Sequence, residues 1–60
     1  MKYQVWYFDI ENWYLSIVHT VGSEFSAQKE YFTDINEAYR YLEYKIKGWP
    51  STTYEIREVE

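Results

Sequence analysis

The chain has 60 residues, with ten Asp and Glu against six Lys and Arg, so its formal net charge is −4 with His19 neutral. This length fits a single domain, residues 1–60, whose core is too small for a large cofactor site or a multi-lobed enzyme. The sequence contains no cysteine, which excludes a disulfide framework and thiolate metal sites.

The charge and the hydropathy pattern favour a soluble cytoplasmic protein. Asp9 and Glu11 interrupt the apolar N-terminal run before a signal-peptide core could form. No apolar stretch approaches the ~18 residues that span a bilayer, so we expect no membrane contact. The negative balance disfavours nucleic acid phosphates as partners and favours basic protein surfaces.

Residues 3–10 and 13–21 are rich in β-branched and aromatic residues, which favours a β-hairpin that turns at Glu11-Asn12. A two-residue loop there, or a four-residue loop of the same parity, gives two distinct faces. The expected core face consists of Gln4, Trp6, Phe8, Ile10, Trp13, Leu15, Ile17 and His19, with Trp6 opposite Ile17. The other face consists of Tyr3, Val5, Tyr7, Asp9, Tyr14, Ser16, Val18 and Thr20, with Tyr7 opposite Ser16.

Gly22-Ser23 ends the hairpin, and residues 24–32 are expected to form a short third strand. The clearest local signal follows it. Asp34 is a predicted N-cap and Glu37 completes a capping box, so a helix is expected over residues 35–47. Gly48 ends this helix. Its apolar stripe, expected to face the sheet, consists of Ile35, Ala38, Tyr39, Leu42 and Ile46.

Residues 52–59 alternate, with Tyr54 and Ile56 on one side and Glu55 and Arg57 on the other, which predicts a closing strand. The order β-β-(β)-α-β indicates a small α+β fold, an antiparallel or mixed sheet with one helix packed on one face. One helix can cover the Trp6 face and leaves the Tyr7 face open.

Tyrosine is enriched where proteins meet proteins, so the open face is a predicted protein-binding surface. Its expected contact residues are Tyr3, Val5, Tyr7, Asp9, Tyr14, Val18 and Glu55. A second predicted strip lies on the outer side of the helix, where a basic partner would bind. It consists of Asp34, Glu37, Tyr41 and Tyr44.

Catalysis finds little support in the sequence. His19 is the only histidine, there is no cysteine, and spacing alone does not join it to Ser16, Ser23 or Ser26 as a nucleophile and base. No carboxylate cluster has the spacing of metal ligands and no glycine-rich phosphate loop is present, so no catalytic residue, metal or cofactor is predicted.

The prediction is therefore a small, acidic, non-enzymatic module that binds a protein stoichiometrically. Its size, acidity and aromatic content resemble the small accessory proteins of bacteriophages and mobile elements, which implies an inhibitor of a host enzyme or defence complex. Nucleic-acid mimicry by the acidic groups is one form of that inhibition. A homodimer formed back to back through the tyrosine face is the alternative, and a single-strand nucleic-acid binder that stacks bases on the sheet is the second.

Overall fold

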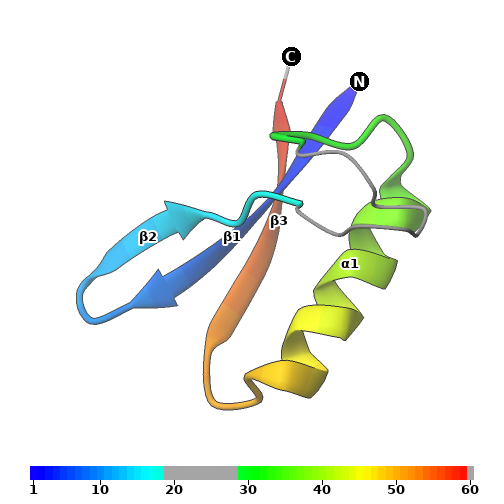
Figure 1. Ribbon diagram of the computed structural model, residues 1–60. Coiled ribbons are helices and arrows are strands. Elements are labelled where there is room, and N and C mark those ends of the chain that lie inside the picture. The colour runs from blue at the N-terminus through cyan, green and yellow to red at the C-terminus, as the bar shows by residue number, and fades with distance from the viewer. Residues whose placement is uncertain (19–28, 60) are drawn as a thin grey trace.

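The computed structural model describes residues 1–18 and 29–59. These ranges contain three strands and one helix, β1 (Lys2–Asp9), β2 (Asn12–Leu15), α1 (Ile35–Gly48) and β3 (Thr53–Val59). The strands form an antiparallel sheet in the order β2-β1-β3, with α1 on one side (Figure 1). The predicted α+β fold is confirmed.

The hairpin turns one residue earlier than expected. Asp9 pairs with Asn12, so the two-residue loop is Ile10-Glu11, and Ile10 has a φ of 61°. A positive φ at only the first loop residue is the pattern of a type II′ turn, a position that favours glycine. The predicted cross-strand partners are wrong by two residues, but the parity is right, so every side chain keeps its predicted face.

The observed register brings aromatic side chains together on both faces of the hairpin. Tyr7 stacks on Tyr14 with ring centroids 5.6 Å apart, and Phe8 meets Trp13 edge to face at 5.2 Å. Each such pair contributes roughly 0.5–1.5 kcal/mol beyond its buried area. The predicted register would have placed Tyr7 beside Ser16 instead, so the observed register gains both aromatic pairs.

After β2, the described part of the chain forms two isolated β-bridges. Val18 pairs with Lys29 and Tyr3 pairs with Phe32, each through two backbone hydrogen bonds of 2.7–3.0 Å. The predicted third strand over residues 24–32 is thus represented by two bridges in its described part. Residues 19–28, including His19, Thr20, Gly22, Ser23 and Ser26, lie outside the described residues.

The helix has the predicted start and a C-terminus one residue later than predicted. The Asn36 N–H donates to the Asp34 carboxylate at 2.9 Å, which confirms Asp34 as the N-cap. The Trp49 N–H closes the last turn on the Lys45 carbonyl at 2.8 Å. Lys45 and Lys47 lie in the last turn, where positive charge complements the helix dipole.

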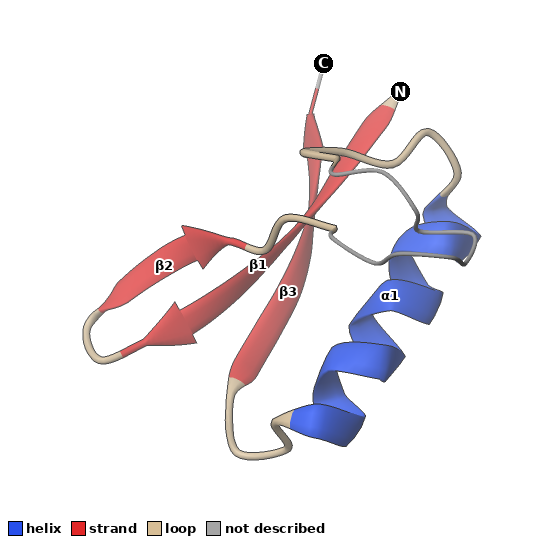
Figure 2. Ribbon diagram, in the orientation of Figure 1, coloured by secondary structure: helices blue, strands red, loops and turns tan. Residues whose placement is uncertain are grey.

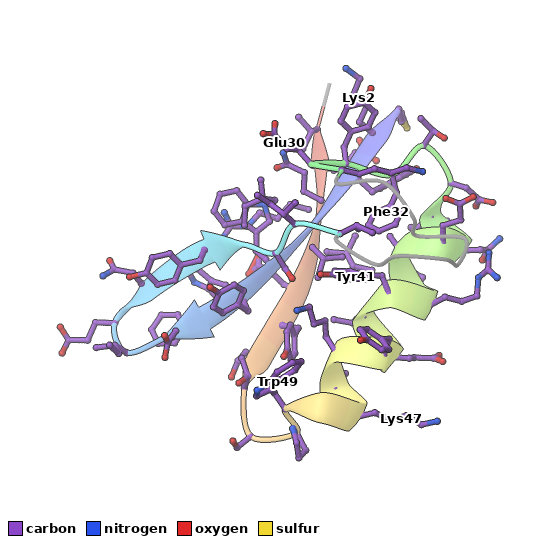
Figure 3. The ribbon with its side chains drawn as sticks, in the orientation of Figure 1. Lys2, Glu30, Phe32, Tyr41, Lys47 and Trp49 are labelled. Atoms are coloured by element: carbon purple, nitrogen blue, oxygen red, sulfur yellow. The ribbon has the colours of Figure 1, made fainter. Side chains whose placement is uncertain are left out.

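The helix covers the face opposite to the one we expected. The buried core consists of Val5, Val18, Phe32, Ala38 and Tyr41, with Tyr3, Leu42, Tyr54 and Ile56 packed against it. Figure 3 shows Phe32 and Tyr41 between the strands and α1, with Lys47 directed away from them. Ala38 is fully buried in this core, and a small side chain at such a position lets a helix approach a sheet closely, whereas the two indoles of the other face are larger.

The rotation of the helix also differs from the prediction. Ala38 and Tyr41 face the sheet, whereas Tyr39, Ile35 and Ile46 of the expected stripe are exposed. Tyr41 is turned inward because its hydroxyl reaches Ser16 and the Ile17 carbonyl beside β2. A buried hydroxyl needs such partners, so the polar contact sets the rotation that the apolar pattern left open.

Candidate functional site

The predicted tyrosine face does not exist as an open surface. Val5 and Val18 are each 1% exposed, and Tyr3 and Tyr7 are half-buried beneath the helix side of the sheet. Tyr14 and Asp9 are exposed near the hairpin end, beyond the covered part of the face. The predicted back-to-back homodimer through this face is therefore wrong, because α1 occupies the place of the second copy.

Glu55 lies on the other side of the sheet from Asp9, since it pairs with Trp6 across β1 and β3. The two carboxylates therefore do not form the common rim that we expected. The predicted helix strip is also divided. Tyr41 is buried at 1% exposure, Glu37 is half-buried, and only Asp34 and Tyr44 are open to solvent.

The surface that the helix leaves uncovered is the opposite side of the sheet, here called the tryptophan face. It consists of Gln4, Trp6, Phe8, Trp13, Leu15, Glu55 and Arg57. Phe8 is exposed, and both indoles and Leu15 are half-buried. Figure 2 shows why, since the single helix lies to one side of the three strands. The reasoning that one helix covers one face was right, and the choice of face was wrong.

Arg57 organises the tryptophan face. Its guanidinium carbon lies 4.2 Å from the centroid of the Trp6 ring and 5.3 Å from that of Trp13. Its Nε donates to the Glu55 carboxylate at 2.8 Å, and the Trp6 indole N–H donates to the Gln4 side-chain oxygen at 3.1 Å. Such cation–π contacts contribute about 0.5–1 kcal/mol at exposed sites, so they favour this arrangement of the rings.

The hairpin tip extends this apolar surface. Ile10 is 83% exposed and holds a left-handed conformation that costs a β-branched residue more than most. In the isolated chain, neither the solvent exposure of this position nor its backbone conformation favours isoleucine. An exposed apolar side chain at a strained turn next to Phe8 is the arrangement expected of a contact residue.

A cleft of about 340 Å³ lies where the C-terminal end of α1 meets the sheet. It is lined by Tyr7, Asp9, Ser16, Lys45, Trp49, Thr52 and Tyr54. The Lys45 ammonium lies 4.9 Å from the centroid of the Trp49 ring. Figure 3 shows Trp49 near the lower end of α1. Since Ser16 already shares its hydroxyl with Tyr41, the cleft offers polar walls but no activated nucleophile.

The described residues contain neither a cluster of metal ligands nor a membrane-spanning helix. Within residues 1–18 and 29–59, no three side chains of His, Cys, Asp or Glu gather closely enough to hold a metal ion. In the described part of the chain, no helix has both the length and the apolar character to cross a bilayer. Comparison of the chain with protein families, curated proteins and solved structures found no match.

Sequence reasoning missed the tryptophan face as a surface because it assigned the larger side chains to the core. The signal that could have found it was the closing strand. Glu55 and Arg57 share a face with the even-numbered residues of β1, and a charged pair at half-exposed positions marks the solvent side of a sheet.

Proposed function

We propose that this chain is a non-enzymatic module that binds a protein partner through the tryptophan face. The observation that carries the proposal is the aromatic cluster on the uncovered side of the sheet, where Arg57 lies over the half-buried indoles of Trp6 and Trp13 and the exposed Phe8 ring meets Trp13. Trp and Arg are the residue types that most often dominate binding energy at protein interfaces. Here contacts within the chain already favour one arrangement of these side chains, which lowers the entropy cost of association.

The polar groups around the cluster support a protein partner over a nucleic acid. A single-stranded nucleic acid could stack its bases on the aromatic rings of this face. Among the described residues of the face, however, the positive charge is that of Arg57, whose Nε is paired with Glu55, so the phosphates would meet no positive groove there. The net charge of −4 acts in the same direction. Inhibition of a host enzyme or defence complex is the biological setting that the resemblance to small accessory proteins of bacteriophages and mobile elements implies.

The test compares what the native chain and two matched variants retain from a candidate host lysate. Phe8→Ala removes an exposed aromatic ring from the tryptophan face and should weaken the binding of a partner by at least about 1–2 kcal/mol. Tyr44→Ala removes an exposed ring from α1 and serves as the control. Circular dichroism establishes that both variants fold.

A protein retained by the native chain and by Tyr44→Ala, but lost with Phe8→Ala, supports the proposal. Equal retention by all three chains would move the binding surface elsewhere. Quenching of tryptophan fluorescence by an oligonucleotide at low salt, lost as salt rises, would replace the protein partner with a nucleic acid.

A further inference from the structure

The outer edge of β3 carries unpaired backbone groups. Tyr3 exchanges both of its backbone hydrogen bonds with Phe32, and the Val5 carbonyl accepts from Ser16, so the odd-numbered residues of β1 bond away from β3. Antiparallel pairing alternates, and it follows that the backbone groups of Tyr54, Ile56 and Glu58 point to the other side of β3. No backbone hydrogen bond reaches that edge within residues 1–18 and 29–59.

We propose that this edge pairs with β3 of a second copy, in antiparallel orientation about a two-fold axis at Ile56, to form one continuous six-stranded sheet. Ile56 then pairs with its own copy, and Tyr54 pairs with the second copy's Glu58. All three residues with outward backbone groups thereby gain partners in both chains. The proposal goes beyond the proposed function and does not depend on it.

The charges of Glu55 and Arg57 favour this register over the two neighbouring registers. Pairing about Ile56 places Glu55 directly opposite the second copy's Arg57, and Arg57 opposite the second copy's Glu55. A shift of two residues in one direction would place Glu55 opposite Glu55 of the second copy, and a shift in the other direction would place Arg57 opposite Arg57 of the second copy. Like charges directly opposite each other destabilise a sheet. Arg57 uses Nε for its own Glu55 and keeps its terminal nitrogens for the second copy.

The helix supplies a second contact on the same side of the molecule. α1 lies against β1 and β3 alike. Two helices centred between these strands in a continuous sheet would be two strand spacings apart, about 9.6 Å. Packed helices are separated by roughly 8–10 Å. The strand pairing therefore brings the two helices to contact distance without a further adjustment.

The side of α1 that would meet its copy is apolar. Tyr41 turns toward β2, to reach Ser16 and Ile17. At about 100° per residue, Tyr39 and Ile46 lie on the opposite flank of the helix, toward the free edge of β3, together with Ile35. Tyr39 is 50% exposed and Ile46 43% exposed. Antiparallel helices would pack this flank against itself and remove it from water.

The first experiment measures association of the native chain by sedimentation equilibrium, from low micromolar to several hundred micromolar. A reversible dimer is expected, and a monomer throughout the range overturns the proposal. Glu58→Pro removes only the outward N–H of an exposed residue, because Tyr3, its neighbour on β1, does not bond to it. This variant should fold and raise the dimer Kd at least about tenfold.

The helix contact has a matched pair of variants. Tyr39→Glu places a charge on the flank that would be buried, and it should also raise the Kd at least about tenfold. Tyr44→Glu places the same charge on the other side of α1 and should leave the Kd unchanged. Equal effects of the two, or a dimer indifferent to Glu58→Pro and Tyr39→Glu, would place the interface elsewhere and overturn the proposal.

A charge exchange tests the register itself. The variants Glu55→Arg and Arg57→Glu each lose the pair within the chain and oppose like charges across the two-fold axis, so each alone should be monomeric. Mixed together they oppose unlike charges, and a heterodimer should form. Because the pair within each chain stays broken, only contacts between chains could produce this rescue, and a mixture that stays monomeric overturns the register.

Discussion

The hydroxyl groups of Ser16 and Tyr41 lie 2.9 Å apart in the buried layer between the sheet and α1. Tyr41 also donates to the Ile17 carbonyl at 3.0 Å. A phenol has one proton to give, so Ser16 is the donor in the bond between the two hydroxyls. This contact joins the helix to the segment after β2, and the two are distant in sequence.

Tyr41→Phe should lower the free energy of unfolding by about 1–3 kcal/mol, because it leaves the Ser16 hydroxyl in the core without its acceptor. Urea unfolding followed by circular dichroism measures the change. Tyr44→Phe, at a position 55% exposed, is the control and should change stability little. If Ser16→Ala adds its full cost on top of Tyr41→Phe, the two hydroxyls are not coupled and the assignment fails.

Ile10→Gly should raise the stability of the chain by about 1 kcal/mol, since glycine adopts a φ of 61° without the clash of a β-branched side chain. The measurement is the midpoint of urea unfolding at an unchanged m-value. Glu11→Gly is the matched control and should not stabilise, because Glu11 has no positive φ. A loss of stability with Ile10→Gly would mean that the turn is not strained.

Asp34→Ala should reduce the free energy of unfolding by about 0.5–2 kcal/mol through the loss of the N-cap bond to the Asn36 amide. Asp34→Asn keeps an acceptor at that position and should retain most of the stability. Thermal unfolding and helical ellipticity report both variants. Equal losses for alanine and asparagine would assign the effect to charge instead of to the hydrogen bond.

Arg57→Lys should leave the net charge unchanged and still loosen the tryptophan face, because lysine lacks the planar group that lies over Trp6 and Trp13. Acrylamide quenching of tryptophan fluorescence, measured in a Trp49→Phe background, should increase. Lys47→Arg, on the outer side of α1, is the control. Quenching that stays at the native level would show that Arg57 does not cover the two indoles.

Local patterns along the sequence were sufficient for the first strand, the helix and the closing strand. They overestimated the second strand, expected over residues 13–21 and observed as Asn12–Leu15, and the expected strand over residues 24–32 has only two bridges in its described part. The capping residue Asp34, the alternation of residues 52–59 and the parity of the hairpin follow from backbone hydrogen bonding and side-chain period, which act over a few residues. That is why the fold class, the helix start and the membership of each sheet face were predicted. The tyrosine surface failed because burial of a face depends on what packs against it.

The sequence by itself determined that the sheet would have two faces with apolar residues and that one helix would cover only one of them. This followed from length and periodicity alone. Only the tertiary structure decided which face the helix covers, since that choice rests on the burial of Ala38 and Val5 in one core and on the polar contact of Tyr41 with Ser16. Both pairs are far apart in the chain. Shape complementarity and the pairing of buried hydroxyls are properties of assembled surfaces, and no local pattern encodes them.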